Sequence, residues 1–397
     1  AAMKLDEYPT TSDYFYPGGE PLQVGDVRVN SAYADLMSDI GKHGSDTLYS
    51  GKIADAIVNA VTTADIPGKL ALSDLESYSV VRRDGVCGGF YDYQVCSAPP
   101  PSSGAVTQIM ITGLYERFTA NLDLDTAEKM QAFVDAQRLS YADRDHYVAD
   151  ADFVDVPVAE LTHPKYLDAR ASDRFSPDAA VFPGDPGEVV NGKSVINMWG
   201  RDTQPAHAGT THMSIVDYDG NAVSFTATVE GAFGSSIWVP EGGFLLNNEL
   251  TDFARNPVLN GKPLANAPAP RKRPRSSMSP TIVLDKNDDL YMVTGSPGGN
   301  SIVAYTAKTL LGVLDWQLTA QDAINLPNVI ARGNTVRVET GVDGGQEIAD
   351  NLKALGYDVQ ERQGENSGLH VIVARDTHFE GGADPRREGV AIELVRP

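Results

Sequence analysis

The stretch that decides the fold of this chain reads Gly209-Thr210-Thr211-His212-Met213-Ser214-Ile215-Val216-Asp217. Its side chains alternate from Thr210 onward, a pattern typical of a β-strand. A turn follows at 218–220, and residues 221–228 return as a second strand. A threonine at the start of a strand, after a loop, becomes a chain end if the chain is cut before it. Its hydroxyl could then act as nucleophile and its freed α-amino group as base.

The segment before this hairpin, residues 176–209, carries prolines among many Asp, Gly and Asn residues and has no hydrophobic period. Such a segment predicts a long, exposed and flexible linker of the kind that tolerates cleavage.

The composition excludes some classes of partner. The 397 residues include 32 Lys and Arg against 54 Asp and Glu, a formal charge of −22. A nucleic-acid partner needs a basic surface, and an anionic membrane also repels an acidic protein. No apolar run approaches the roughly 20 residues of a membrane-spanning helix, and residues 1–6 lack the apolar core of a signal peptide. We therefore expect no nucleic-acid partner and no membrane segment in this chain.

The two cysteines, Cys87 and Cys96, lie in a predicted hairpin. If Tyr91-Asp92 is its two-residue turn, alternation makes Cys87 and Cys96 a non-hydrogen-bonded pair with Cα atoms about 4.5 Å apart. That separation allows a disulfide, which would indicate an oxidising compartment. Two reduced, packed thiols are the alternative.

Helical periodicity dominates before Thr210, and strands accompany helices after it, which predicts a layered α/β fold with largely antiparallel sheets. We expect one helix over 30–40, with Gly41 as its C-cap, and a second from 45 to 61. A third should follow Ser102-Ser103, whose side chains would cap it. Further helices are expected over 126–147, 301–314, 320–324 and 346–355. We expect further strands over 78–82, 243–246, 281–284, 290–294, 369–374 and 390–395.

Several familiar catalytic motifs are missing, including a Gly-x-Ser-x-Gly elbow, a phosphate-binding loop and a metal-spaced His/Cys cluster. The pair Gly298-Gly299 follows a predicted strand and could aim backbone N–H groups at one point, as an oxyanion hole does, although such a pair is more often a turn. His212 stands beside the threonine, where a structural role and a direct one are both open.

Together these stretches closely resemble the γ-glutamyltranspeptidase family of N-terminal-nucleophile hydrolases. The matching phrases are Thr-Thr-His-x-Ser-x-Val-Asp-x-Asp-Gly-Asn-Ala-Val (210–223), Phe-Gly-Ser (233–235), Leu-Leu-Asn-Asn-Glu (245–249), Lys-Arg-Pro-x-Ser-Ser-Met-Ser-Pro-Thr-Ile-Val (272–283), Gly-Ser-Pro-Gly-Gly (295–299), Ala-Asp-Pro-Arg (383–386), Tyr-Ala-Asp-Arg (141–144) and the segment 99–104. The resemblance covers nearly the whole chain.

The resemblance implies a four-layer αββα sandwich and a precursor that cuts itself between Gly209 and Thr210. Residues 1–209 would be the C-terminal part of the large subunit, and 210–397 the small catalytic subunit, both in one αββα domain and associated as a heterodimer. The implied catalytic residues are Thr210 as nucleophile, Thr228 beside it, and Gly298 and Gly299 for the oxyanion. The implied substrate-binding residues are Ser276 and Ser277 for an α-carboxylate, with Glu249 and Asp252 for an α-ammonium.

The chain departs from the family in three places. The family's long N-terminal region, with an arginine that clamps the substrate carboxylate, has no counterpart here, and Arg271, Arg273 and Arg275 are candidates for the clamp only by proximity in sequence. Glu230 stands where many members have a substrate-binding asparagine. The segment 254–271 is short and lacks a lid tyrosine, which favours water or bulky acceptors.

The resemblance implies hydrolysis or transfer of glutathione-like γ-glutamyl compounds through an acyl-threonine, with water, an amino acid or a peptide as acceptor and with no cofactor and no metal. It also implies a periplasmic or secreted location. A related glutaryl or cephalosporin-type acylase is an alternative function. An unprocessed or truncated relative that only binds amino-acid-like ligands is another.

Overall fold

The computed structural model describes residues 5–173, 175–202 and 209–393 of the chain. They fall into two compact units, each described here by itself. The first unit comprises residues 1–83 and 229–249, and the second comprises residues 84–228 and 250–397.

The first unit is mainly helical, and its small apolar core contains Leu36, Ile53, Ile57 and Val239. The Asn30 side chain caps the second helix by accepting from the Tyr33 N–H. Its elements are α1 (Pro9–Phe15), η1 (Pro17–Gly19), α2 (Ser31–His43), α3 (Asp46–Tyr49), α4 (Gly51–Thr62), α5 (Leu72–Glu76), β5 (Trp238–Val239) and β6 (Phe244–Leu245).

The second unit is built on a six-stranded antiparallel sheet in the order β1-β2-β9-β10-β14-β15. A three-stranded sheet, β11-β12-β13, has one parallel pair, β12 with β13. The strands are β1 (Val86–Phe90), β2 (Tyr93–Ser97), β9 (Thr281–Leu284), β10 (Leu290–Gly295), β11 (Val329–Arg332), β12 (Thr335–Glu339), β13 (Asp358–Arg362), β14 (His370–Ala374) and β15 (Phe379–Ala383). Two short strands, β7 (Val258–Leu259) and β8 (Lys262–Pro263), pair with each other.

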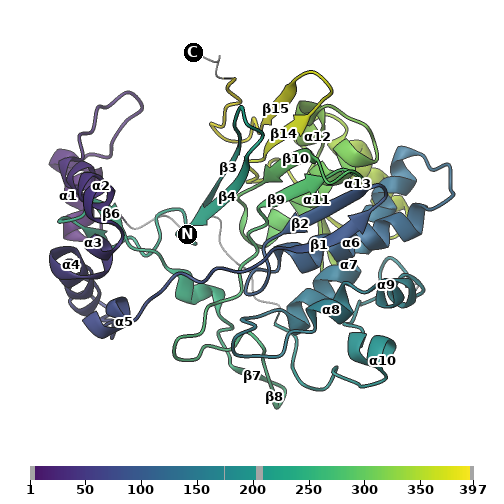
Figure 1. Cartoon of the computed structure of the whole chain (residues 1–397), viewed down its shortest axis with the longest axis horizontal. Coiled ribbons are helices and arrows are strands. Elements are labelled where there is room, and N and C mark those ends of the chain that lie inside the picture. Colours follow the sequence, from purple (N-terminus) through teal and green to yellow (C-terminus); the bar gives the residue numbers. More distant parts are fainter. Residues whose placement is uncertain (1–4, 174, 203–208, 394–397) are drawn as a thin grey trace. The chain divides into compact units, whose positions relative to one another are not determined.

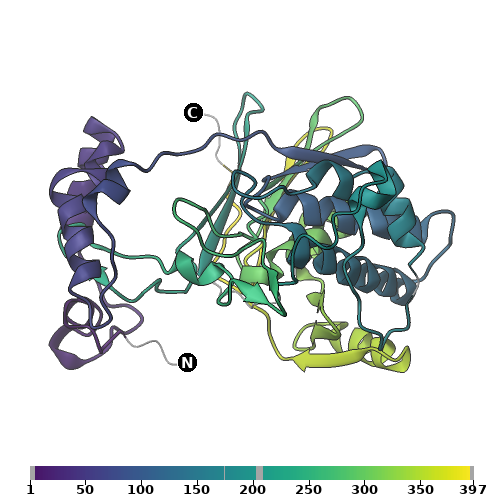
Figure 2. The same ribbon diagram turned by 90° about the horizontal axis from the view of Figure 1, so that it is seen from below.

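A helical layer covers one face of the large sheet (Figures 1 and 2). Its members are α6 (Gly104–Thr119), α7 (Thr126–Tyr147), α11 (Ile302–Leu314) and α12 (Ala320–Asn325). Helices α6 and α7 are largely buried, every residue of α11 is buried, and α12 is half-buried. A helix that is apolar all round is typical of such a central position. The other elements are α8 (Val158–Leu161), α9 (Pro164–Ala171), α10 (Pro186–Asn191), η2 (Glu249–Asp252), η3 (Gly299–Ser301) and α13 (Gly345–Ala354).

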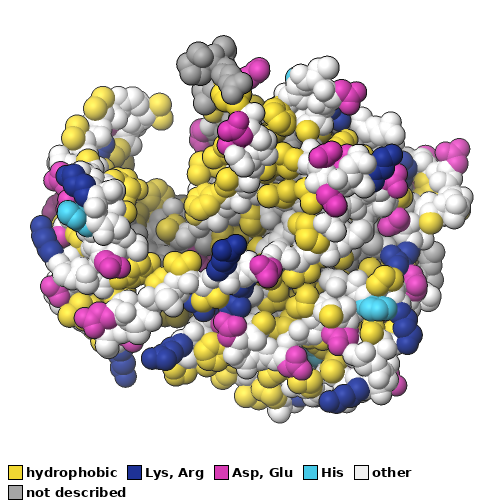
Figure 3. All heavy atoms as spheres, viewed as in Figure 1, with side chains coloured by type: hydrophobic (Ala, Val, Ile, Leu, Met, Phe, Trp, Pro, Cys, Tyr) yellow, Lys and Arg dark blue, Asp and Glu magenta, His cyan; other side chains and the backbone are white. Residues whose placement is uncertain are grey.

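The hairpin of β3 (Thr210–Val216) and β4 (Ala222–Thr228) packs on the large sheet through β10 and β14. Its polar side chains point inward: the Ser224 hydroxyl donates to the Thr294 carbonyl at 2.9 Å. Its apolar side chains point outward, and Figure 3 shows apolar side chains exposed over this part of the unit. The outward group is Met213, Ile215, Val223 and Phe225, each between 46% and 50% exposed.

The predicted fold class, an αββα sandwich with largely antiparallel sheets, is confirmed by these sheets and by the structural similarity reported below. The second unit supplies three layers in order: helices, the six-stranded sheet and the β3–β4 hairpin. The outward apolar face of the hairpin is where a further layer would pack.

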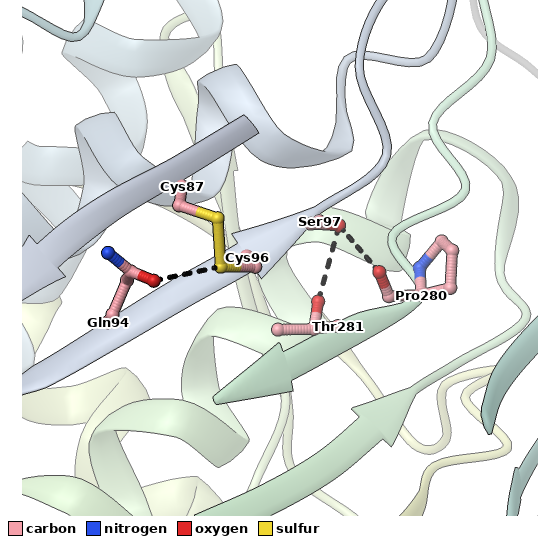
Figure 4. The surroundings of a disulfide bond; sticks show 6 residues. All are labelled: Cys87, Gln94, Cys96, Ser97, Pro280 and Thr281. Atoms are coloured by element: carbon pink, nitrogen blue, oxygen red, sulfur yellow. Dashed lines mark hydrogen bonds between the residues drawn. A yellow bond between two sulfur atoms is a disulfide. The ribbon is translucent and has the colours of Figure 1, made fainter. Parts of the chain in front are cut away.

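The disulfide predicted as one of two alternatives is present, and the predicted register is correct. Cys87 faces Cys96 across β1 and β2 with Cα atoms 4.1 Å apart, and the two sulfurs are bonded (Figure 4). The end of β2 is held independently, because the Ser97 hydroxyl donates to the Pro280 carbonyl at 2.8 Å. The hairpin therefore has two restraints, the disulfide and its pairing with β9.

Replacing both cysteines (C87S/C96S) is expected to lower the free energy of unfolding by about 2–3 kcal/mol, since a short covalent loop is opened in the unfolded chain. Urea denaturation with and without dithiothreitol measures this. Reductant should shift the wild-type midpoint toward that of the variant and leave the variant unchanged. Equal midpoints for all samples would show that the bond contributes nothing to stability.

The segments before and after Gly209 share one sheet, since β2 pairs with β9. They are also tied near residues 200–202: the Gly200 N–H donates to the Pro263 carbonyl at 2.9 Å, and Asp202 forms an ion pair with Arg275 at 3.0 Å. Chain pieces produced by a cut at 209 would be held together by this shared sheet, as a heterodimer requires.

Several sequence predictions were wrong in detail. The structure has no strand over 78–82 or over the described residues 390–393, where Val80 and Val390 are largely exposed and a strand would gain no packing. The linker 176–209 is not one exposed loop: it contains α10 and the buried Val181, and residues 203–208 lie outside the described residues. Gly41 lies within α2, which ends at His43 with Gly44 as its C-cap. Ser103 is the N-cap residue of α6, but its hydroxyl donates to the Ser276 carbonyl and does not cap the helix. The Ser102 hydroxyl accepts from the Gly104 N–H at 3.3 Å, as predicted, and donates to the Met278 carbonyl.

Candidate active site

Two threonine hydroxyls meet at the open end of the β3–β4 hairpin. Thr210, the first residue of β3, faces Thr228, the last residue of β4. The Thr210 hydroxyl donates to Thr228 Oγ1 at 3.0 Å, and the Thr228 hydroxyl donates to the Gly209 carbonyl at 3.4 Å. Thr210 is 7% exposed. The antiparallel register thus joins a buried hydroxyl, a second hydroxyl and the carbonyl of the bond predicted to be cut.

Arg387, which sequence reasoning missed, holds the main chain of Thr210. Its Nη1 donates to the Thr210 carbonyl at 3.1 Å, and its Nη2 donates to both the carbonyl and the side chain of Asn366 at 2.9 Å. Burial lowers the pKa of Arg387. The only sequence signal was its position directly after the matching phrase Ala-Asp-Pro-Arg at 383–386.

His212 lies between the two sheets and has both ring nitrogens engaged. Nδ1 lies 2.8 Å from the Thr226 hydroxyl, and Nε2 lies 3.1 Å from the Ser214 hydroxyl. Because Ser214 donates its proton to the His370 carbonyl, it must accept from His212 Nε2, so Nδ1 accepts from Thr226. Burial, with a smaller effect of His370, lowers the pKa of His212 to about 3. The imidazole is neutral at physiological pH, and this geometry favours the structural role.

The loop after β10 has the backbone that a glycine pair permits. Gly298 has φ 137° and Gly299 has φ 59°. A Cβ on Gly298 would lie 2.4 Å from the ring of Tyr305. A Cβ on Gly368 would meet both Pro297 and the Arg387 side chain, at 2.7 and 2.9 Å. Pro297 of the glycine loop and Arg387, which holds Thr210, therefore both lie against Gly368.

The two serines of the predicted carboxylate site differ in their bonding. The Ser276 hydroxyl accepts from the Met278 N–H at 3.1 Å, and within the described part of the chain its own proton has no acceptor. The Ser277 hydroxyl donates to Asn300 Oδ1 at 3.1 Å and accepts from Arg144 at 2.5 Å. Ser276 can donate to a ligand at once, whereas Ser277 must exchange its bond to Asn300.

The predicted acidic residues fall in different units. Asp252 ends η2 in the second unit, and the Asn266 side chain donates to its carbonyl at 2.8 Å. Glu230 and Glu249 belong to the first unit, so their proximity to Thr210 stays a prediction. Glu230 has φ 70° and accepts from the Asn248 side chain. A buried glutamate in this conformation is uncommon and is held by its surroundings.

Arg275 is not a carboxylate clamp. Its guanidinium is 5% exposed and forms an ion pair with the buried Asp202. A group that already neutralises a buried carboxylate is not available to a substrate. Arg273 lies 3.9 Å from Asp152. Arg271 adopts φ 65°, and among the described residues no hydrogen bond or ion pair links it to Thr210.

Two absences concern residues 5–173, 175–202 and 209–393. No group of three or more His, Cys, Asp or Glu side chains there could hold a metal ion. None of the helices found there combines the length and the apolarity needed to span a membrane.

Comparison with known proteins places the chain in one family. The family model described as Gamma-glutamyltranspeptidase matches residues 1–394. The chain is 34% identical over 396 residues to the glutathione hydrolase proenzyme of Escherichia coli (strain K12), and 32% identical over 390 residues to that of Bacillus subtilis (strain 168). Each match covers 96% of this chain but 64% of the relative, so the chain spans less than two thirds of these proteins.

Two acylases are also similar. The Acylase ACY 1 proenzyme of Pseudomonas sp. (strain SE83) is 28% identical over 99% of this chain and 66% of the relative. The crystal structure of cephalosporin acylase from Bacillus halodurans superposes with a TM-score of 0.80 at 23% identity, covering 96% of this chain and 65% of that one. The structural similarity supports the fold. The family model and the identity to the two proenzymes show that this chain belongs to the gamma-glutamyltranspeptidase family.

Proposed function

We propose that this chain cleaves γ-glutamyl amides such as glutathione by hydrolysis or transfer, with Thr210 as nucleophile after a cut at Gly209–Thr210. The observation that carries the proposal is the hydroxyl pair of Thr210 and Thr228 at the Gly209 carbonyl, in a chain of this family. The proposal concerns the activity of whole proteins of this family, and this chain spans 64% of the length of the two proenzymes compared above.

The first step is the cut itself. The Thr210 hydroxyl attacks the Gly209 carbonyl carbon, the C–N bond breaks, and the acyl group passes from nitrogen to oxygen as an ester. Water then cleaves the ester, leaving a carboxyl group on Gly209 and a free α-amine on Thr210. The Thr228 hydroxyl, which points at the Gly209 oxygen, is suited to stabilise the negative charge that forms there.

The second step is turnover. The Thr210 hydroxyl attacks the γ-carbonyl of the substrate and passes its proton to the Thr210 amine. The protonated amine then donates to the departing amine, leaving an acyl-threonine ester. Water or the amine of an amino acid or peptide takes the acyl group and restores the hydroxyl. The N–H groups of Gly298 and Gly299 would stabilise the oxyanion.

Recognition of the glutamyl end is assigned to opposite charges and hydrogen-bond donors. Ser276 and Ser277 would donate to the α-carboxylate. Asp252, with Glu230 and Glu249, would bind the α-ammonium. The disulfide of Cys87 and Cys96 supports a periplasmic or secreted location, because such bonds persist in oxidising compartments.

The purified chain is expected to release the chromophore from a γ-glutamyl anilide, with at most slow release from the matched glutaryl anilide that lacks the ammonium group. No release by a correctly cut protein would contradict the proposal. Preference for the glutaryl compound would support the acylase alternative, which the two similar acylases keep open. A stable full-length chain that binds glutamate without turnover would support the non-catalytic alternative.

A further inference from the structure

Arg144 joins every segment proposed to bind the carboxylate and the oxyanion. It lies in the last turn of α7 and is 1% exposed. Its Nε donates to the Ser103 hydroxyl at 2.9 Å, and its Nη2 donates to Ser277 Oγ at 2.5 Å and to Asn300 Oδ1 at 3.1 Å. One rigid guanidinium therefore contacts three separate loops.

Each residue that Arg144 contacts on these loops belongs to the proposed site or adjoins it: Ser277 is a proposed site residue, and Ser103 and Asn300 each adjoin one. The Ser103 hydroxyl donates to the Ser276 carbonyl at 2.9 Å. Asn300 follows Gly299, and its carbonyl accepts from the Tyr141 hydroxyl at 2.7 Å, on the same helix as Arg144. The end of α7 thus fixes the serine loop and the glycine loop relative to each other.

The charge of Arg144 is not fully neutralised by its ion pair. Asp145 accepts from Arg144 at 2.8 Å but is shared with Arg332 at 2.9 Å. Burial alone would raise the pKa of Asp145, but Arg332 and then Arg144 lower it, so the carboxylate stays ionised. Arg275 pairs with Asp202, whose N–H donates to the Asp145 carbonyl. In this cluster three guanidinium groups are held by two carboxylates, which leaves an excess positive charge behind Ser277.

We propose that Arg144 is the positioning residue that makes the serine loop selective for a carboxylate, acting through Ser277. A hydroxyl that accepts a hydrogen bond from a cation becomes a stronger donor. When a substrate carboxylate arrives, Ser277 transfers its own hydrogen bond from Asn300 to that carboxylate and keeps its bond from Arg144. This inference rests on the proposed function. In it, Arg144 supplies the positive charge that Arg275 cannot supply.

The test compares two substrates that differ only in the α-carboxylate, γ-glutamyl anilide and 4-aminobutyryl anilide. R144M is expected to raise KM for the γ-glutamyl compound about tenfold and to leave KM for the 4-aminobutyryl compound unchanged, because only the former interacts with the charge. R144K keeps the charge and should restore most of this selectivity. It should still lower kcat, because a single ammonium cannot hold all three loops.

Arg170 provides the matched control. It is 5% exposed and pairs with Asp143, one residue before Arg144. R170M should cost stability without changing the ratio of the two KM values. If R144M and R170M change that ratio equally, or if neither changes it, the role of Arg144 is merely structural and the proposal is overturned.

A double-mutant cycle keeps the test decisive if R144M does not fold. S277A removes the proposed link, so R144Q, a second variant without the charge, should raise KM for the γ-glutamyl compound in the wild-type background and not in S277A. Calorimetric titration of the cut protein with glutamate and 4-aminobutyrate separates this proposal from the function. Arg144-dependent preference for glutamate without turnover would sink the proposed activity alone. Turnover with unchanged selectivity would contradict the role of Arg144 alone. A protein that shows no binding and no turnover would contradict both proposals.

Discussion

Replacing Thr210 with alanine is expected to leave one uncut chain that releases no product from a γ-glutamyl anilide. The variant lacks the hydroxyl that attacks the Gly209 carbonyl, so the ester cannot form and the α-amine is never freed. Denaturing gel electrophoresis and intact mass measure the cut, and chromophore release measures turnover. We expect at least a thousandfold loss of turnover, the scale on which removal of a nucleophile acts.

Two matched variants interpret this result. T211A changes the neighbouring, exposed threonine of the same strand and should be cut and active like the wild type. T210S keeps a hydroxyl and should still be cut. Fragments ending at Gly209 and beginning at residue 210 in the T210A protein would rule out Thr210 as the nucleophile of the cut.

Replacing Gly298 with alanine is expected to lower kcat by about a hundredfold or more, the cost of losing one oxyanion donor. The substitution is unfavourable in two ways. Gly298 has φ 137°, which L-residues rarely adopt, and the new methyl group would lie 2.4 Å from the Tyr305 ring. Relieving the backbone strain or the contact with Tyr305 would rotate the peptide groups that carry the proposed N–H donors. Steady-state kinetics of correctly cut protein measure the effect.

Gly220 separates backbone strain from loss of the oxyanion site. It has φ 84° in the turn between β3 and β4, and no atom lies within 4 Å of the Cβ position. G220A should cost about 1 kcal/mol of stability, with kcat unchanged. A G298A protein with wild-type kcat would exclude Gly298 from the oxyanion site, whatever its stability.

Elements with strong local periodicity could be predicted from the sequence. Helix α7, strand β9 and the register of the β1–β2 hairpin were all correct, because their apolar spacing and turns encode them locally. The predicted strand at 78–82 is absent, as is the described part, 390–393, of the strand predicted at 390–395, since a strand also needs a partner, which periodicity does not reveal. The ordered part of 176–202 was missed because it folds through contacts such as that of Gly200 with Pro263.

The residues of the proposed site likewise fall into those that the sequence could predict and those that it could not. The threonine pair and the glycine pair proposed for the site could be named, because residue type and motif indicate the chemistry proposed for them. Arg144 and Arg387 could not: each acts through partners more than 100 residues away, Asn300 and Thr210 respectively. Arg275 was a candidate clamp by sequence proximity alone, and only the fold shows that it already forms an ion pair with Asp202.

The anchoring of Asp202 has a consequence for the end that a cut at 209 would create. Asp202 is 3% exposed and bonds to Arg275, Asn266 and the Asp145 carbonyl. The seven residues that follow it can reach at most about 25 Å when fully extended. After a cut, the new carboxylate of Gly209 would therefore stay within about 25 Å of Asp202, which corresponds to an effective concentration in the millimolar range around this anchor.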